Sequence, residues 1–309
     1  MARLPWTRPD LGAFAQWFDL PVASGAFAVT FLGVASLLID DGETQVLTDG
    51  FFSRPGLRAV ALGRIAPDPA RIDQGLARAG GDRVRAVVPV HSHFDHALDS
   101  AFVAAKSGAM LLGGHSTANL GRGGGLPQGQ IRTVADGDAV SVGAFTLTFV
   151  SSRHCPPDRF PGVISAPVVP PAKASAYKCG EAWSIVVRHS GGRRMLVQGS
   201  AGYVEDALAD HSAEVAYLGV GQLGKRDDEY IRRYWEHTVR AVGAKEVVLI
   251  HWDDFFRPLD PPLLALPYAG DDLNATMRML TGLADADGVR LHFPTVWQRQ
   301  DPWAVPDPR

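Results

Sequence analysis

The residues best suited to chemistry lie in one hexapeptide, HSHFDH, at residues 91–96. Alternate residues at the end of a strand point to the same side, so His91 and His93 can converge on one ion while Asp95 and His96 turn toward a neighbouring position. Imidazole nitrogens with a carboxylate oxygen suit zinc. Because three of the ten histidines of the chain fall within these six positions, the hexapeptide predicts a metal site rather than a merely polar loop.

The hexapeptide directly follows residues 84–90, a run apolar enough to predict a strand that is buried on both faces. Helix patterns at residues 69–78 and 98–106 flank this strand. In the second half, a strand at 215–220 leads into a helix at 228–242, although no sequence repeat is visible. Alternating strands and helices predict an α/β layered fold.

One uncharged stretch, residues 20–39, is long enough to be weighed as a membrane span. It contains Pro21, Gly25 and Gly33, however, and no leucine-rich signal core is found before it. The stretch therefore predicts buried strands and no transmembrane segment. Since no secretion signal is recognised, the expected location is the cytoplasm.

Composition excludes several classes of protein. The 309 residues are 20% charged and 46% hydrophobic, with a formal net charge of −3 at pH 7, as in an ordinary soluble globular protein. Because 33 acidic residues outnumber 30 basic ones and no basic tract is found, no nucleic-acid partner is expected. Cys155 and Cys179 are too few for a disulfide framework, so they are expected to be reduced thiols, with a single bridge as the alternative.

The hexapeptide is similar to the His-x-His-x-Asp-His motif of the metallo-β-lactamase superfamily. Other pieces of the chain follow in the order of that family across residues 27–295. The sequence GVAS at residues 33–36 resembles the Gly-His-Ala-Ser of metal-hydrolase branches, and Asp49 follows the third predicted strand, as in those branches. Val34 departs from the family histidine, so any polar role at that position is lost here.

The resemblance implies a four-layer αββα sandwich, an α/β fold of layered α+β type. Residues 25–309 would form a single domain, preceded by an N-terminal arm at residues 1–24. Its two pseudo-symmetric halves, about 25–180 and 181–309, would meet at a metal cleft. A proline-rich loop at residues 152–180 is long enough to be functional or disordered.

The resemblance also implies the remaining metal ligands. His154 follows a predicted strand and corresponds to the third histidine of the first site, with His91 and His93. His251 corresponds to the last ligand of the family and would complete a second site with Asp95 and His96. Asp95 would in addition orient the attacking hydroxide, which makes it the expected catalytic residue.

The chain departs from the family at Ser200, because family members usually carry Gly-Asp where this chain has Gly199 and Ser200. That aspartate bridges two metals. Without it, two ions could be joined by a hydroxide or an anion that Ser200 hydrogen-bonds, one ion could bind alone, or Asp253 or Asp254 could supply the carboxylate. We expect at least one zinc ion with partial or anion-dependent occupancy of the second position; manganese and iron remain alternatives. A small residue in a tight turn is the plain structural interpretation of Ser200.

Four further residues carry weaker signals, each with a structural alternative. Asp49 could orient a metal histidine, Arg159 could hold an anionic substrate group, and Tyr203 could hydrogen-bond a substrate oxygen. Asp253 could contact the substrate or a metal ligand. A strand-end turn, a solvated surface charge or core packing would explain the same residues.

The expected function is a zinc-dependent hydrolase that uses a metal-bound hydroxide on an ester, lactone or phosphodiester bond of a small, anionic substrate. Its features look most like the branch that includes ascorbate-6-phosphate lactonase and the N-acylphosphatidylethanolamine-hydrolysing phospholipase D. Because of Ser200, a non-catalytic metal-binding protein that senses or carries an anionic metabolite is the alternative. The sequence leaves a homo-oligomer open.

Overall fold

Two seven-stranded sheets pack face to face in the computed structural model, which describes residues 4–305. The strands of the first sheet are β1 (Ala28–Phe31), β2 (Leu37–Asp40), β3 (Gln45–Thr48), β4 (Val84–Val88), β5 (Met110–Gly113), β6 (Ile131–Thr133) and β14 (Arg299–Gln300). Those of the second are β7 (Ala139–Val142), β8 (Phe145–Ser152), β9 (Ala182–His189), β10 (Arg194–Gln198), β11 (Val215–Gly219), β12 (Glu246–Ile250) and β13 (Arg290–His292). Their orders are β14-β1-β2-β3-β4-β5-β6 and β13-β12-β11-β10-β9-β8-β7.

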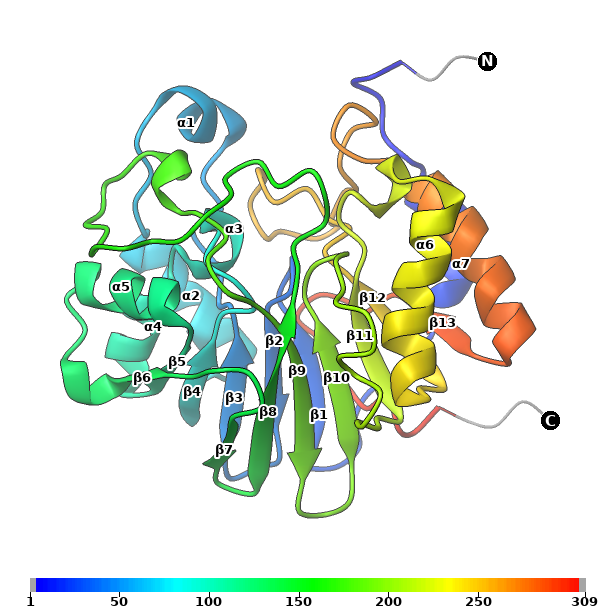
Figure 1. Cartoon of the computed structure of the whole chain (residues 1–309), viewed down its shortest axis with the longest axis horizontal. Coiled ribbons are helices and arrows are strands. Elements are labelled where there is room, and N and C mark those ends of the chain that lie inside the picture. Colours follow the sequence, from blue (N-terminus) through cyan, green and yellow to red (C-terminus); the bar gives the residue numbers. More distant parts are fainter. Residues whose placement is uncertain (1–3, 306–309) are drawn as a thin grey trace.

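Helices cover the outer face of each sheet. The helices are α1 (Leu57–Leu62), α2 (Pro69–Ala79), α3 (Phe94–Ala97), α4 (Ser100–Ser107), α5 (His115–Gly123), α6 (Asp228–Trp235) and α7 (Leu273–Asp287). Figure 1 shows α2, α4 and α5 on one side of the sandwich and α6 and α7 on the other. The predicted four-layer αββα architecture is thus confirmed.

Local sequence explains where helix α2 begins and ends. Pro69 occupies its first turn, and the side chain of Asp68 accepts hydrogen bonds from the backbone N–H groups of Ala70 and Arg71. Gly80 ends the helix in the left-handed conformation, at φ 68°. The helix predicted at 69–78 is therefore observed almost residue for residue.

The two sheets change from antiparallel to parallel pairing at corresponding places. Strands β3 to β6 are parallel to one another in the first sheet, as are β10 to β13 in the second. Strand β8 runs in the same direction as β10, because both pair antiparallel with β9. The carboxyl ends of β3, β4, β8, β10 and β12 can therefore supply side chains to one edge of the sandwich.

The uncharged residues 20–39 fold into β1 and β2, so the prediction of buried strands is confirmed. Within residues 4–305 no helix has the length and apolar character needed to cross a bilayer. The chain passes to the second sheet between β6 and β7, at residues 134–138, well before the predicted division near residue 180. Strand β14, near the C-terminus, returns to pair with β1.

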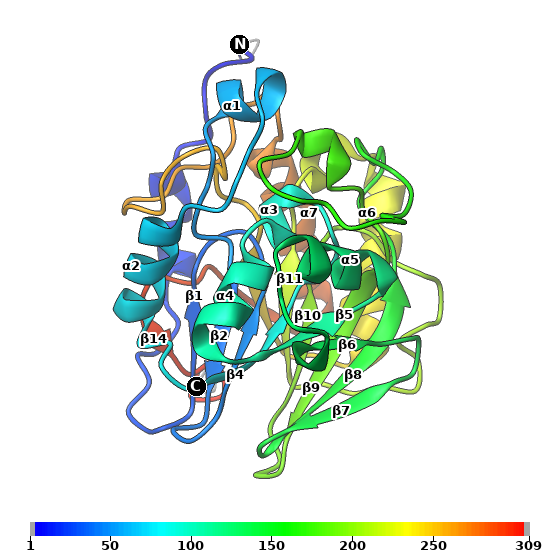
Figure 2. The same ribbon diagram turned by 90° about the vertical axis from the view of Figure 1, so that its left-hand side faces the viewer.

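The N-terminal arm packs on the sandwich through apolar contacts. Its 3-10 helix, Leu11–Trp17, buries Phe14, whose ring lies 5.9 Å from that of Phe293. Val22 forms an isolated bridge with Gln300 of β14. The predicted arm thus contacts the C-terminal part of the chain, on the side away from α5 (Figure 2).

A buried histidine ties the arm to the second sheet and gives a prediction on stability. Nδ1 of His292 lies 2.6 Å from Oδ1 of Asp19, and Nε2 lies 2.8 Å from Oε2 of Glu246. Burial lowers the pKa of His292, but the hydrogen bonds to Glu246 and Asp19 outweigh it and raise the pKa above its ordinary value. This stabilisation is complete below the unfolded pKa, about 6.5, and is lost as the pH rises through the folded pKa.

We therefore expect His292→Gln to lower the free energy of unfolding by about 2–3 kcal/mol at pH 6 and by less at pH 9. Urea unfolding of the variant and the parent protein at both pH values measures the difference. Titrating groups that do not contact His292 cancel in that difference. An equal loss of unfolding free energy at the two pH values would contradict the raised pKa of His292.

Candidate metal centre

Five strand ends bring the predicted ligands together at one edge of the sandwich. The hexapeptide 91–96 follows β4 and continues into α3, His154 follows β8, and His251 follows β12 directly. Asp49 follows β3, and Ser200 lies two residues beyond β10. Apart from His154, which is partly exposed, these site residues are buried.

The first group of ligand atoms comes from His91, His93 and His154, whose ligand atoms lie within 4.8 Å of one another. Nε2 of His91 is 3.1 Å from Nδ1 of His93. His154 donates its Nδ1 proton to the carbonyl oxygen of Cys155 at 2.7 Å, which leaves Nε2 free to bind an ion. Three imidazole nitrogens thus converge from two strand ends.

The second group comes from Asp95, His96 and His251, again with ligand atoms within 4.8 Å of one another. Oδ2 of Asp95 lies 3.5 Å from Nε2 of His251 and 3.7 Å from Nε2 of His96. Nε2 of His96 is buried and has no hydrogen-bond partner among the described residues. A cation between these atoms would satisfy this nitrogen.

The pKa shifts of His91, His154 and Asp95 favour a divalent ion. Burial lowers the pKa of His251, but the hydrogen bond to Asp95 outweighs it and raises that pKa, so an ion at the second group would displace a proton from His251. Burial, reinforced by neighbouring imidazoles, lowers the pKa of His91 well below its ordinary value and that of His154 to about 4. Burial acts to raise the pKa of Asp95, but the charge on His96 and the hydrogen bond from His251 outweigh it and lower the pKa. Unprotonated imidazoles beside an ionised carboxylate are the ligand form that zinc and similar ions require.

Unusual backbone conformations aim two of these residues. Asp49 and His251 have φ values of 52° and 60°, in the left-handed region that side chains other than glycine seldom adopt. Gly221 leaves room for the His251 ring, since a Cβ there would lie 2.8 Å from Nδ1 of His251. The His251 backbone N–H also donates to the carbonyl oxygen of Val34 at 2.7 Å.

Asp49 holds His96 in one orientation. Its Oδ2 accepts the Nδ1 proton of His96 at 2.7 Å, and its Oδ1 accepts the backbone N–H of Val90 at 2.9 Å. With the proton fixed on Nδ1, Nε2 presents its lone pair to the second group. Such outer contacts set the tautomer and basicity of a metal-binding histidine.

Asp49→Asn should lower the affinity for an ion at the second group by about 10–100-fold. The amide nitrogen would donate to Nδ1 of His96 and move the ring proton to Nε2, the atom required as ligand. Competition with a chromophoric chelator measures the affinity. Asp41→Asn is the matched control, because Asp41 pairs in the same way with His189 at 3.2 Å outside both groups; equal affinities for all three proteins would contradict the role of Asp49.

Ser200 lies beside the first group but offers no charge. Its Oγ accepts the backbone N–H of Cys155, next to His154, at 3.1 Å. Its own carbonyl oxygen accepts hydrogen bonds from Nε2 of Gln198 at 3.0 Å and from the hydroxyl of Tyr234. The hydroxyl of Ser200 therefore contacts the backbone next to His154 and brings no carboxylate to either group.

The structure does not bring Asp253 or Asp254 into either group. Asp253 forms a buried ion pair with Arg54 and accepts the backbone N–H of Val34 at 2.8 Å. Asp254 pairs with Arg8 at 2.7 Å. Both carboxylates are thus engaged by cations, and Asp253 braces the backbone that positions His251.

The weaker candidates lie farther out. Arg159 is exposed on the long loop. Tyr203 is half-buried, stacks on His237 with ring centroids 5.3 Å apart, and lines a cavity of about 380 Å³ that His154 also lines. Cys155 and Cys179 are both free and buried, and burial raises the pKa of Cys155 to about 12, which makes this thiol a poor nucleophile.

Two contacts were not predicted from the sequence. Oδ1 of Asp158 lies 3.1 Å from Nε2 of His93, on the side of the ring away from His91. Asp158 therefore orients the ring of His93, as Asp49 orients the ring of His96. Arg54 is buried under the site, at 1% side-chain exposure, and holds Asp253. A lone aspartate in a long loop and a lone arginine after a strand carry no periodic signal.

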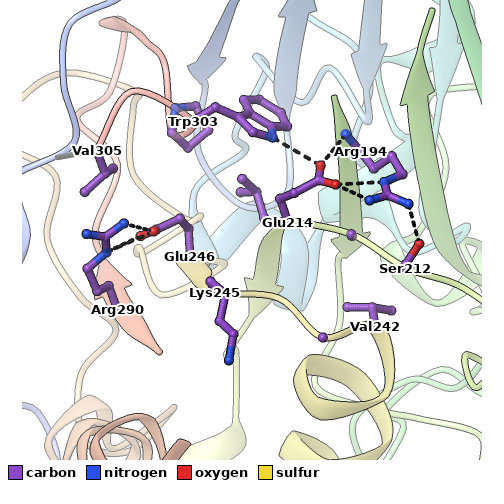
Figure 3. Close-up of a pocket in the computed structure, with 13 residues that line it drawn as sticks. Arg194, Ser212, Glu214, Val242, Lys245, Glu246, Arg290, Trp303 and Val305 are labelled. Carbon is purple, nitrogen blue, oxygen red and sulfur yellow. Dashed lines mark hydrogen bonds and ion pairs between the residues drawn. The ribbon is translucent and has the colours of Figure 1, made fainter. Parts of the chain in front are cut away.

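Another pocket, of about 450 Å³, lies away from the metal ligands at the amino ends of β10 to β13 (Figure 3). Four of its five charged side chains pair with one another, Lys245 being the fifth. Nε of Arg194 donates to Glu214 at 2.7 Å, and Nε of Arg290 donates to Glu246 at 2.9 Å. The indole of Trp303 also donates to Glu214. These pairs stabilise the lower end of the sheet, and the pocket offers no convergent metal ligands.

Residues 44–252 match the sequence model of the beta-lactamase superfamily domain. The match spans more than half of the chain, and the protein therefore belongs to the metallo-β-lactamase superfamily. A search of curated proteins finds no match.

Solved structures share the fold. "A possible metal-dependent hydrolase" from Veillonella parvula is 15% identical, with a TM-score of 0.53, over 89% of this chain and 99% of that one. The isothiocyanate hydrolase from Delia radicum gut bacteria is 14% identical, with a TM-score of 0.52, over 88% and 98%. CmlA, a diiron beta-hydroxylase from Streptomyces venezuelae, is 13% identical, with a TM-score of 0.55, over 91% of this chain and 55% of its own.

Proposed function

We propose that this protein is a metal-dependent hydrolase of an ester, lactone or phosphodiester bond. The observation that carries the proposal is the pair of ligand groups, His91, His93 and His154, and Asp95, His96 and His251, at one edge of the sandwich. A bound divalent ion would lower the pKa of a water molecule toward 7 and polarise the bond to be cleaved. Zinc is the expected ion, with iron and manganese as alternatives, because histidine with carboxylate suits all three.

The side chains of the chain itself would orient the reaction. Asp95 is buried and ionised, so its carboxylate can accept a hydrogen bond from the attacking water and orient it. Asp49 and Asp158 hold His96 and His93 in the orientations described above. Ser200 can offer its hydroxyl proton to an anion between the two groups while Oγ accepts from Cys155.

We infer that the substrate is small and anionic. The cavity of about 380 Å³ beside His154 is lined by Arg153, Tyr203 and Tyr230. Glu205 lies on the same wall. The guanidinium of Arg153 and the two aromatic side chains suit a carboxylate or phosphate attached to a flat group.

A metal count combined with a substrate panel tests the proposal. The metal-loaded protein would be analysed by inductively coupled plasma mass spectrometry and then assayed with lactone, aryl ester, thioester and phosphodiester substrates. Hydrolysis of one class, lost after chelation and restored by metal, is the expected result. Tight metal binding without hydrolysis, together with an anionic metabolite in native mass spectra, would favour the alternative of a non-catalytic carrier or sensor. That alternative is considered because Ser200 stands where a bridging aspartate was expected.

A further inference from the structure

Large apolar side chains that face solvent are concentrated at one end of the molecule. Among residues 4–305, eight such side chains are exposed. Only Val22 lies elsewhere; the other seven belong to residues 4–8, 55–66, 159–178 and 255–268. These seven, here called the apolar rim, are Leu4, Trp6, Leu57, Leu62, Val163, Val169 and Leu264.

Backbone hydrogen bonds join the four segments that carry the apolar rim in two pairs. Ile65, after α1, exchanges two backbone hydrogen bonds with Ala172 of the long loop, at 2.7 and 2.9 Å. Tyr268 donates its backbone N–H to the carbonyl oxygen of Thr7 at 2.9 Å. Figures 1 and 2 both place α1, the N-terminal arm and the long loop at the same, upper end of the molecule.

Helix α1 is the most unusual part of the apolar rim. Its sequence, LRAVAL, contains five apolar residues in six, yet none of the six is buried. The side chain of Leu62 is 85% exposed. Water-soluble proteins seldom leave such a helix uncovered, and an apolar surface of this kind marks a contact with another molecule or with lipid.

The exposed charges beside the apolar rim are mainly positive. Six exposed cations lie in the same four segments, against one exposed acid, Asp260. Among the described residues, none of the six forms an ion pair with a carboxylate. The six cations are Arg58, Arg64, Arg159, Lys173, Lys178 and Arg257. Because the whole chain has a net charge of −3, this end is a cationic surface on an acidic protein.

The apolar rim adjoins the metal ligands. The long loop passes from them outward, since the carbonyl oxygen of Phe160 lies 3.3 Å from Nε2 of His93. On the other side, the ring of Phe255 lies 5.8 Å from that of His251. A surface bound to the apolar rim would therefore face the entrance to the site.

We propose that this end of the protein docks on a lipid bilayer that contains anionic phospholipids. The apolar side chains would enter the headgroup region, and the cations would lie beside the lipid phosphates, as in other interfacial segments. A neutral partner or a second copy of this cationic face would leave the six cations unmatched. An anionic bilayer offers phosphates to the cations and an apolar phase to the exposed apolar side chains together, which is why a bilayer is the occupant chosen. The proposal does not depend on the hydrolase activity, because it concerns only surface groups.

Co-sedimentation of the metal-loaded protein with vesicles tests the docking. Vesicles of phosphatidylcholine alone would be compared with vesicles that also contain phosphatidylglycerol. We expect binding to the second kind only, weakening as salt is added. Leu62→Asp should reduce the partition coefficient at least tenfold, and Lys173→Ser should reduce it about fivefold.

The controls place comparable substitutions, apolar to aspartate and cation to serine, outside the apolar rim. Val22→Asp and Arg132→Ser alter an exposed valine and an exposed arginine elsewhere on the surface, and both should bind like the parent protein. Val169→Asp provides a second apolar variant, should Leu62→Asp lower the melting temperature. No binding of the parent protein to anionic vesicles would overturn the proposal. So would equal losses in rim and control variants, or a dimer in sedimentation velocity that Leu62→Asp dissociates.

Discussion

His93→Ala is expected to release the ion held by the first group and to abolish hydrolysis. The variant would keep only His91 and His154 in that group. A metal ligand is worth roughly 3 kcal/mol or more in a site of four ligands, so the affinity should fall by at least about 100-fold. Competition with a chelator gives the affinity, and the rate with the substrate found in the panel gives the activity.

Two comparisons sharpen this result. His115→Ala removes an exposed histidine outside both groups and should change neither metal content nor rate. His251→Ala removes a ligand of the second group only. If His93→Ala retains both metal and turnover, the proposed centre is wrong; if His251→Ala loses the rate while one ion per chain remains bound, both groups are needed for the reaction.

The sequence could predict the first ligands because their spacing is local. His91, His93, Asp95 and His96 lie within six residues after a buried strand, and the structure brings their side chains into two groups as expected from that spacing. His154 and His251 are isolated in the sequence, and only the family pattern connected them to the hexapeptide. Their meeting depends on β8 and β12 running in the same direction within one sheet, which is a tertiary property.

The sequence does not show which sheet a strand joins or which distant residues come into contact. Residues 139–152 alternate as a strand pair should, but alternation reports which face a side chain takes, not which sheet a strand joins. Alternation thus could not show that β7 and β8 belong to the second sheet. The first half was expected to extend to about residue 180. Arg54 and Asp158 act through contacts with Asp253 and His93, at sequence separations of 199 and 65 residues.

Buried charges below the site hold part of its backbone in place. Arg54 and Asp253 form an ion pair at 1% exposure of each side chain, and Asp253 also accepts the N–H of Val34. Removing either partner would leave an uncompensated charge in the interior, which is strongly destabilising. Val34 in turn fixes His251, because its carbonyl oxygen accepts the His251 backbone N–H. The backbone at Val34 thus serves the site although its side chain is apolar.

Ser200→Asp is expected to raise the affinity for a second ion by about 30-fold or more. Two dications about 3.5–4 Å apart repel each other by on the order of 20 kcal/mol at an effective dielectric constant near 20. Among the six candidate ligands, only Asp95 carries a negative charge that offsets this repulsion. One added carboxylate about 4 Å from a dication contributes about 2 kcal/mol even with the screening of water, which is a factor of about 30. The gain would be larger inside the site.

Hydrogen bonding favours the substitution, because an aspartate oxygen can accept the N–H of Cys155 that Ser200 now accepts. Ser200→Asn is the control, since the amide has the shape of the carboxylate without its charge. Metal per chain, measured after dialysis against buffered free metal, should rise toward two for Ser200→Asp and stay at the parent value for Ser200→Asn. Identical metal content in all three proteins would mean that charge at position 200 does not limit the second ion. If metal content rises while the rate per chain stays constant, one ion suffices for the reaction and the second group serves to hold Asp95 in place.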